Sequence, residues 1–492
     1  MKNLKIKDLL PCFLLIAAMG VHKISFCQAT RQETAGNKTT GSEMTTGRND
    51  AARYEKTIAK LLKDTAFTRV LSDYIRTAVF AETMVMVHDV VNPPAASRYY
   101  AYAMLGAYAV VTQNTEDPGI PDAAAFIKNY PKHTRLTTRN NSYDYRIAAL
   151  FSILETGKLM LPSGFLLQEQ EDKFIRILQK NRVPRVLIDQ CLAAGREATL
   201  QIVAWSKGDN YSKLSAKLRY TPIKGDQYWY PTPPAYIEAV EPNWRIIRPM
   251  VIDSSDQFVP PPLTPFSKDT ASDFYKLVME VYHVSKDTGA QSLYERTIAG
   301  FWDCNPFAVT SQGHMMIGFK KMSPGGHWMD ITGNVARVAG LDFSHSIQAH
   351  TLVAAAIMDA FICCWDEKYK TNRIRPETYI NRYIDIKWQP YLQTPPFPEY
   401  TSGHSVISTA AAQMLTYLLG THLDYTDNAE QLFEIAPRTF HSFREAAAEA
   451  TISRLYGGIH YRDAIVNGQV EGEAVGNEVV RRIQAAGIRP YR

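Results

Sequence analysis

The stretch IQAHTLVAAAIMDAFICCW, residues 347–365, decides the fold class. It is rich in Ala and Ile and long enough for about five helical turns, and similar apolar stretches occur at 95–111, 142–160 and 405–420. Few windows alternate in the manner of a β-strand, so the pattern predicts an all-α fold. Asp359 interrupts this run, and a membrane span needs 18 or more uncharged apolar residues. We therefore expect a core helix and no transmembrane segment in the mature chain.

Composition agrees with an ordinary globular protein. The chain has 492 residues, 46% of them hydrophobic, and a net charge of +5. No block of Lys and Arg stands out, so nucleic acid is not an expected partner. Four cysteines beyond Cys27 have neither a metal-ligand spacing nor the density of a disulfide framework, so we expect buried small hydrophobes and leave any disulfide pairing open. They are Cys191, Cys304, Cys363 and Cys364.

The N-terminus is typical of an export signal. Three lysines precede the apolar run LLPCFLLIAAMGV, and small residues follow at Cys27 and Ala29. This predicts cleavage after Ala29 and a periplasmic or secreted mature protein. A lipid anchor on Cys27 is the second interpretation, because bulky Phe26 disfavours that processing. An uncleaved membrane anchor is the third, and the run is short for it.

The rest of the chain divides by composition. A polar stretch with few apolar residues indicates a disordered linker. Helical periodicity before and after a second stretch, which is rich in Pro and aromatic residues, indicates two helical bundles. The Pro- and aromatic-rich stretch itself indicates an irregular, packed connection between them. The expected segments are a signal peptide at 1–29, a linker at 30–54, an N-terminal bundle at 55–205, the connection at 206–265 and a C-terminal bundle at 266–492.

Three separated motifs carry charge and chemistry. In KYKTNRIRP, residues 368–376, Lys368 and Arg375 lie about two helical turns apart. FPEYTSGHSVIS, residues 397–408, leads into an apolar helix, and SRLYGGIHYRD, residues 453–463, places Arg454 and His460 across a flexible Gly pair. Each has an ordinary explanation: a solvated basic face, a helix N-cap, and a histidine with satisfied nitrogens.

Together the motifs suit a tetrahedral oxyanion such as phosphate or vanadate. Lys368, Arg375 and Arg454 would neutralise its oxygens, and Arg can do so with two parallel hydrogen bonds. Ser402 and Gly403 stand where a helix begins, and a helix start with free N–H groups attracts anions. Of the two histidines, His404 and His460, one could bind the central atom and the other could move a proton.

The arrangement resembles the phosphatidic acid phosphatase type 2 and vanadium haloperoxidase superfamily, whose three motifs occur here in order and at the expected spacings. The size and the stretches NPPAASRYYAYAMLGAYAVV, YWYPTPPAY and EPNWRIIRPMV resemble its large haloperoxidase-like branch. The resemblance covers residues 75–490 and is strongest over 350–465. It implies two packed helical bundles, with the anion bound in the C-terminal one.

The resemblance also implies roles for the motif residues. Vanadate would be held by His460, with hydrogen bonds from Lys368, Arg375, Ser402, Gly403 and Arg454, and His404 would be the acid/base residue. The bound vanadate would act as a Lewis acid that activates hydrogen peroxide toward a halide, and the vanadium would keep one oxidation state. Trp365 and Phe397 fall at halide-pocket positions of the family, and core packing is their other interpretation.

The sequence departs from the family pattern at two positions. Thr401 replaces a proline, which is a mild change. Ala464 replaces the aspartate that orients the nucleophilic histidine, and Asp463 lies one residue early. Asp463 could still reach His460, because residues three apart share a helix face. The departure therefore bears mainly on phosphatase turnover, which needs an oriented nucleophile.

Three functions compete. The first is a vanadate-dependent haloperoxidase, which would use hydrogen peroxide, a halide and a small organic substrate. The second is a phosphomonoesterase with His460 as nucleophile, because phosphate has the shape and charge of vanadate and would compete for the pocket. The third is a non-enzymatic anion-binding protein, which the completeness of the motifs disfavours.

Overall fold

The computed structural model describes residues 55–114, 117–131, 136, 143–312, 315–318 and 320–491. The expected signal peptide at 1–29, the linker at 30–54 and Cys27 lie outside these residues. Within the described part the fold is all-α, as the sequence predicts, with two small antiparallel hairpins. The predicted domain boundaries stay predictions, although α6 ends at Ser206 and α7 begins at Asp273, on either side of the expected connection.

The N-terminal helices precede the connection, and the remaining helices follow it. The first set comprises α2 (Thr65–His88), α3 (Pro93–Thr112), α4 (Tyr145–Met160), α5 (Gln168–Lys180) and α6 (Arg185–Ser206). The second comprises α7 (Asp273–Lys286), α8 (Ala290–Phe301), α9 (Pro324–Val338), α10 (Phe343–Thr371), α11 (Pro376–Tyr383), α12 (Gly403–Leu419), α13 (Phe443–Tyr456) and α14 (Arg462–Ala485).

The strands form two short hairpins. Strand β1 (Val309–Gln312) pairs with β2 (Met315–Gly318), starting from Val309 opposite Gly318. Strand β3 (Tyr425–Asp427) pairs with β4 (Arg438–Phe440), starting from Tyr425 opposite Phe440, and the 3-10 turn η5 (Ala429–Phe433) lies between them.

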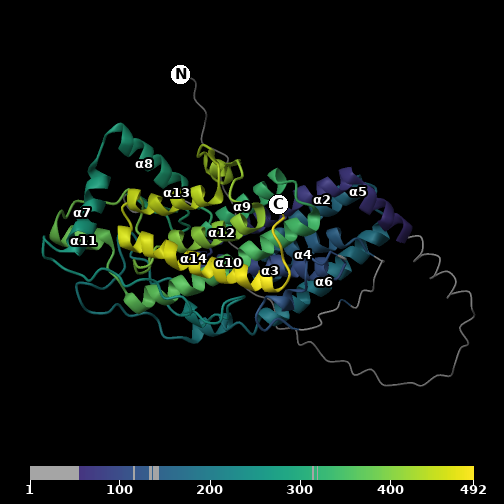
Figure 1. Cartoon of the computed structure of the whole chain (residues 1–492), viewed down its shortest axis with the longest axis horizontal. Helices are drawn as coiled ribbons and strands as arrows, with labels where there is room; N and C mark the ends of the chain where they lie inside the picture. Colours follow the sequence, from purple (N-terminus) through teal and green to yellow (C-terminus); the bar gives the residue numbers. More distant parts are fainter. Residues whose placement is uncertain are drawn as a thin grey trace, which may run out of the picture. The chain divides into compact units, whose positions relative to one another are not determined.

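Helix α10 contains the stretch that decides the fold class. It contacts α3, α9, α12 and α14, so one hydrophobic core runs through both sets of helices. Figure 1 shows α10 in the middle of the helices, with α2–α6 toward one end and α7, α8 and α11 toward the other. Within the described residues α10 alone has the length and composition to cross a membrane, and its most apolar window is completely buried in the protein.

The connection between α6 and α7 packs on this core instead of lying free. Trp229 and Trp244 are buried, as we expect for a stretch rich in aromatic residues. Asp359 of α10, which interrupts the apolar run, accepts hydrogen bonds from the backbone N–H groups of Met250, Val251 and Ile252 at 2.7, 2.7 and 2.9 Å. The charged residue in the core helix therefore anchors the connection.

The start of α12 lies close against the start of α14. A Cβ atom at Gly468 would lie 2.9 Å from Ser405 Cβ and 3.1 Å from the carbonyl oxygen of Ser402, so the absence of a side chain permits the approach. The N–H of Ser402 donates to the carbonyl of Ala464 at 3.0 Å. This packing brings the second and third motifs together.

Candidate active site

The three motif segments meet at one end of α10. Lys368 lies in the last turns of α10 and Arg375 caps α11, while His460 lies in the turn between α13 and α14. Arg375 Nη1 lies 3.1 Å from His460 Nε2, although 85 positions separate them. The convergence predicted from the motifs is therefore observed for the residues that carry the charge and the imidazole.

A small cavity opens at this meeting point. Its volume of 30 Å³ is room for about two water molecules. The expected site residues that line it are Gly403, His404, Arg454, His460, Trp365 and Phe397. Lys368, Arg375 and Ser402 are buried beside these residues but do not line the cavity. Side chains must shift before the cavity can hold a tetrahedral oxyanion.

Three of the predicted site residues have buried polar atoms with no hydrogen-bond partner: Arg375 Nη2, Ser402 Oγ and His404 Nε2. Ser402 is the N-cap of α12, yet its hydroxyl makes no capping hydrogen bond. Helix capping alone therefore does not explain this serine. Buried polar atoms are almost always paired in proteins, and unpaired ones cost free energy. The cluster fits an oxyanion that accepts from the arginine and the serine and shares a proton with the histidine.

The cationic side chains are held by backbone carbonyls. Lys368 Nζ donates to the carbonyls of Pro398 and Glu399 at 3.1 and 3.2 Å, and also to that of Thr401. Arg375 donates to the carbonyls of Phe397 and Ile459 at 2.9 and 2.8 Å. Both residues therefore fix the loop before α12, and one guanidinium nitrogen of Arg375 stays available.

Burial and mutual repulsion perturb the ionisation of this cluster. Burial lowers the pKa of Lys368 to about 8 and that of Arg375 to about 10. Burial, followed by the charges of Arg375 and Lys368, holds the pKa of His460 well below its usual range. His460 is therefore neutral, and its Nε2 lone pair faces the cations. An anion in the site would oppose these shifts, because opposite charge favours the charged form of each cation.

The carboxylate that contacts His460 belongs to Glu399. Glu399 Oε1 accepts from His460 Nδ1 at 2.9 Å and from the N–H of Tyr461 at 3.0 Å, and its other oxygen accepts from Arg373 at 3.2 Å. This bond places the imidazole proton on Nδ1 and leaves the Nε2 lone pair as an acceptor, which receives the N–H of Arg375 Nη1 at 3.1 Å. Glu399 is completely buried, and burial raises its pKa.

Asp463 does not take the orienting position that we expected of it. Its carboxylate accepts from Arg373 at 2.8 and 2.9 Å and from the N–H of Thr264 at 3.0 Å. Arg373 thus bridges Asp463 and Glu399. Sequence reasoning missed Glu399 because 61 positions separate it from His460. The available signal was a carboxylate three residues before Ser402, in an otherwise apolar stretch.

His404 lies in the first turn of α12, beside the cavity. Burial, followed by the charges of Arg454 and His460, holds its pKa well below the usual range, and a hydrogen bond to the Trp302 backbone opposes this shift. Arg454 donates to the carbonyl of Trp302 at 2.6 Å and to Ser453 Oγ at 2.9 Å. His404 is therefore neutral, with an unpaired nitrogen at the cavity.

Trp365 and Phe397 form an aromatic wall of the cavity. Their ring centroids are 4.9 Å apart. The indole N–H of Trp365 donates to the carbonyl of Val240 at 3.1 Å, which fixes the ring. Lys368 Nζ and the Arg375 guanidinium each lie 5.1 Å from the Phe397 ring centroid. Both residues contribute to the core and line the cavity, so the two interpretations from the sequence are compatible.

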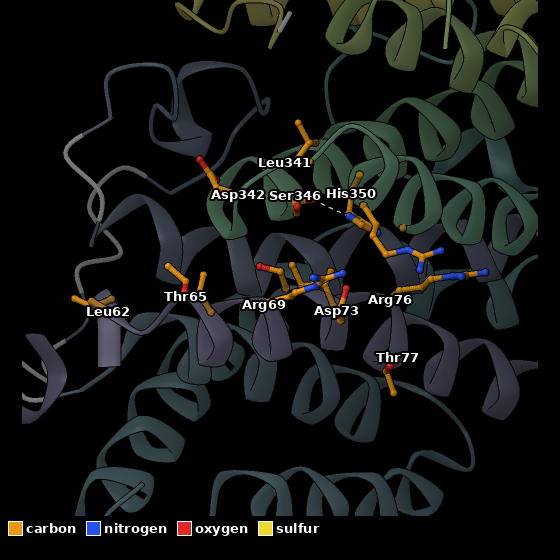
Figure 2. A pocket seen from close by; sticks show the side chains of 17 residues that line it. Leu62, Thr65, Arg69, Asp73, Arg76, Thr77, Leu341, Asp342, Ser346 and His350 are labelled. Atoms are coloured by element: carbon orange, nitrogen blue, oxygen red, sulfur yellow. Dashed lines mark hydrogen bonds between the residues drawn. The ribbon is translucent and has the colours of Figure 1, made fainter. Parts of the chain in front are cut away.

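A larger pocket of 710 Å³ lies elsewhere, between α2 and the α9–α10 region. Figure 2 shows Arg69, Asp73 and Arg76 on one side of it and Asp342 and His350 on the other. None of the three motifs contributes a side chain to this pocket. The candidate active site is therefore the smaller cavity, which His404 and His460 line and beside which Arg375 and Ser402 are buried.

Comparison with known proteins identifies the fold and the family. Residues 348–487 match the family described as the VCPO second helical-bundle domain. No curated protein matches the chain. A bacterial vanadium-dependent chloroperoxidase, solved in holo and apo forms, shares the fold at 14% identity in each form. The match to the holo form has a TM-score of 0.58 and covers 81% of this chain and 93% of the chloroperoxidase. The match to the apo form has a TM-score of 0.57 and covers 79% of this chain and 94% of the chloroperoxidase.

A solved bacterial vanadium-dependent iodoperoxidase is 38% identical to this chain, with a TM-score of 0.76. The match covers 83% of this chain and 95% of the iodoperoxidase. Identity at this level over nearly the whole of the relative extends beyond the three motifs and includes both sets of helices. The chain belongs to the vanadium haloperoxidase family.

Proposed function

We propose that this protein is a vanadate-dependent haloperoxidase that oxidises a halide with hydrogen peroxide. The observation that carries the proposal is the cluster of predicted site residues at one cavity. His404 and His460 line it, Arg375 Nη1 lies 3.1 Å from His460 Nε2, and Arg375, Ser402 and His404 each have a buried polar atom without a partner. A tetrahedral oxyanion supplies the partners that these atoms lack. Vanadate bound there would act as a Lewis acid toward peroxide.

The residues of the chain would divide the work as follows. His460 offers its Nε2 lone pair, and Glu399 keeps the imidazole proton on Nδ1. Arg375 and Lys368 are buried beside the cavity and provide positive charge, in surroundings where electrostatic interactions are strong. The start of α12 adds free backbone N–H groups and the Ser402 hydroxyl. His404 takes or gives a proton at the cavity.

Iodide is the proposed halide, because the 38% identical relative is described as an iodoperoxidase. Trp365 and Phe397 present a polarisable aromatic surface at the cavity. Large, weakly hydrated anions lose little hydration free energy when they approach such a surface. The oxidised halogen would then react with a small organic substrate.

Phosphate-ester hydrolysis is the second candidate. Glu399 supplies His460 with the orienting carboxylate that Ala464 does not, so the sequence-based argument against an activated nucleophile loses its premise. Phosphate would compete with vanadate for the same donors. An aspartate at position 464 is therefore not needed for an oriented histidine.

The deciding experiment assays purified protein in parallel for peroxide-dependent iodide oxidation with added vanadate and for phosphate-ester hydrolysis. We expect vanadate-dependent iodide oxidation, inhibition by phosphate, and loss of the activity in His460→Ala. His404→Ala should lower turnover more than vanadate affinity, because His404 moves protons and does not anchor the anion. Brisk ester hydrolysis without any vanadate-dependent oxidation would favour the phosphatase.

We also propose that the protein is exported after removal of residues 1–29. The basic residues and apolar run of the N-terminus support this. Mass spectrometry of the mature protein from a cell fractionation should find an N-terminus near residue 30 outside the cytoplasm. An intact Met1 in the cytoplasmic fraction would contradict export, and a lipid-modified Cys27 would favour the anchored form.

A further inference from the structure

Three buried side chains with metal-binding atoms meet next to the active site. Cys304 follows α8, His327 lies in the first turns of α9, and Glu430 belongs to η5. Cys304 Sγ lies 3.3 Å from His327 Nδ1 and 3.9 Å from Glu430 Oε1, and His327 Nδ1 lies 3.3 Å from Glu430 Oε1. These three residues have no part in the proposed catalytic mechanism.

We propose that Cys304, His327 and Glu430 bind a Zn²⁺ ion. Zinc prefers a tetrahedron, with bonds of about 2.3 Å to sulfur, about 2.05 Å to imidazole nitrogen and about 2.1 Å to carboxylate oxygen. The edges of such a tetrahedron are about 3.6 Å for S···N, about 3.6 Å for S···O and about 3.4 Å for N···O. The observed separations differ from these edges by about 0.3 Å or less. The ligand atoms are thus already placed for zinc.

The surroundings of the three ligands support the site independently. Glu430 is completely buried, yet its Oε2 has no hydrogen-bond partner. A second carboxylate contact or a water molecule on the metal would satisfy this oxygen. The other nitrogen of His327 lies 2.8 Å from Asp427 Oδ2. A carboxylate on the far nitrogen of a ligating histidine fixes its orientation and raises its basicity, as is usual at zinc sites.

Neighbouring groups also hold two of the ligands in place. The indole of Trp302 stacks on the His327 ring at 4.5 Å and 18°. Asp427 also accepts a hydrogen bond from the N–H of Ala429 at 3.0 Å. The carboxylate that contacts His327 therefore also holds the residue that precedes Glu430. Orientation of this kind lowers the cost of assembling a metal site.

Zinc suits this site better than other divalent ions. A thiolate, an imidazole and a carboxylate form a ligand set of borderline softness, which disfavours magnesium and calcium. Zinc is also redox-inactive, so peroxide at the neighbouring cavity would not change its oxidation state. Cys304 lines that cavity together with His404 and Arg454. Coordination would withdraw the thiol from reaction with the oxidant.

The experiment uses the full mature chain, stripped with a chelator and titrated with Co²⁺ and then with Zn²⁺. We expect one Co²⁺ per chain, a thiolate-to-cobalt charge-transfer band, and loss of the band when Zn²⁺ displaces cobalt. Cys304→Ala should abolish the band. Asp427→Asn should weaken Co²⁺ affinity by ~10–100-fold, as other changes around ligating histidines do. Cys191→Ala, which removes another buried thiol, should leave the band unchanged.

A second measurement does not depend on the folding of a ligand variant. Zn²⁺ should protect Cys304 of the unaltered protein from alkylation and from peroxide oxidation, as read by peptide mass spectrometry. Absence of a charge-transfer band, or equal modification of Cys304 with and without Zn²⁺, would overturn the proposal. Either result would mean that a protonated His327 bridging Asp427 and Glu430 accounts for the cluster without metal.

Discussion

Glu399 decides the chemistry of His460 at the scale of single residues. An imidazole can expose either nitrogen, and the hydrogen bond at one nitrogen selects the other for reaction. Here the 2.9 Å contact between Glu399 and Nδ1 leaves Nε2 beside Arg375. A histidine held in this way can bind the central atom of an oxyanion without first rotating or losing a proton.

Glu399→Gln should therefore lower turnover by ~10–100-fold, the usual effect of losing the partner of a reactive histidine. Its amide can still accept one hydrogen bond but carries no charge for the imidazole or for Arg373. Steady-state kinetics and vanadate affinity measure the effect. Asp463→Asn is the matched control, because Asp463 reaches His460 only through Arg373. A larger loss in the control would show that the carboxylate roles are reversed.

Ser402 gives a sharper case, because its hydroxyl has no partner in the folded chain. Ser402→Ala removes an unpaired buried polar atom, so the free energy of unfolding should stay within ~0.5 kcal/mol or rise. Vanadate affinity should fall by ~tenfold, which corresponds to one lost hydrogen bond to a charged group. Thermal unfolding and a binding titration read the two effects separately.

Ser408 of the same helix is the control for this prediction. It is buried, and its hydroxyl accepts from the Trp328 indole N–H at 2.9 Å. Ser408→Ala should destabilise the fold by ~1–3 kcal/mol, because the indole loses its acceptor, and should leave vanadate affinity unchanged. The same response in both variants would contradict a ligand-binding role for Ser402.

The pH dependence of anion binding should report Lys368. Its pKa of about 8 in the folded chain is below the ordinary 10.5, so the unfolded chain holds more protons between these values. Stability without anion should thus rise with pH in this window. Phosphate affinity should fall above about pH 8 as the ammonium loses its charge. Lys368→Met should bind weakly already at pH 7 and show no step near pH 8, whereas an unaltered step would exclude Lys368 as its cause.

At the scale of elements, the important junctions are those between helices and irregular segments. The start of α12 is the proposed anion-binding site, because the Ser402 hydroxyl makes no capping hydrogen bond and the first N–H groups of the helix have no side-chain cap. Most other helices of the second set, for example α7, α9 and α13, have capped N-termini, with Ser272, Ser323 and Ser442 accepting from backbone N–H groups. Helices α8, α11 and α14 also lack a side-chain cap, but they begin at Gly289, Arg375 and Tyr461, whereas α12 begins at a serine, which ordinarily caps a helix. An N-cap serine that makes no capping hydrogen bond therefore distinguishes α12.

Asp359 shows how one helix side chain holds an irregular segment. Asp359→Asn should lower the free energy of unfolding by ~2–4 kcal/mol, since an amide cannot accept all three backbone hydrogen bonds in the buried site. Denaturant unfolding measures the change. Asp366 of the same helix is also buried, but it pairs with the exposed side chains of Lys370 and Arg245 instead of backbone N–H groups, so Asp366→Asn should cost less than Asp359→Asn. Equal costs would mean that the connection is held by its buried aromatics alone.

At the scale of the whole molecule, the site depends on long-range packing. Lys368 and His460 lie 92 positions apart, and helices α10, α12 and α14 bring their segments together around one core. The assembled cluster buries the cationic side chains of Lys368, Arg375 and Arg454, and the burial of charge costs free energy. A bound anion should offset part of this free-energy cost.

Vanadate or phosphate should therefore stabilise the protein against heat. A ligand present at 100 times its dissociation constant adds about 2.7 kcal/mol when it binds only the folded chain. Differential scanning calorimetry at increasing ligand concentration measures this, and Arg375→Ala should show no ligand-dependent shift. An equal shift in the variant would indicate that the anion binds elsewhere, for example at the arginines of the larger pocket in Figure 2.

Several features could be predicted from the order of residues alone, because they depend on local interactions. Apolar periodicity predicts the helices, and Pro and aromatic content predicts the irregular connection between them. The spacing of Lys368 and Arg375, and of Arg454 and His460, allowed the oxyanion site to be proposed before any geometry was known. Motifs of this kind are readable because each lies within a few helical turns.

The tertiary structure was needed wherever partners are distant in the chain. Glu399 and Asp463 are both carboxylates near motif residues, and Asp463 is the nearer to His460 in sequence. Folding reverses this order, because Arg373 engages Asp463 from one side and directs Glu399 toward the imidazole. Likewise, Cys304, His327 and Glu430 have no recognisable ligand spacing, and only the packing of α8, α9 and η5 brings them together. Local pattern specifies elements and candidate chemistry, whereas the pairing of buried charges follows from packing, since each buried group binds whichever partner the core places beside it.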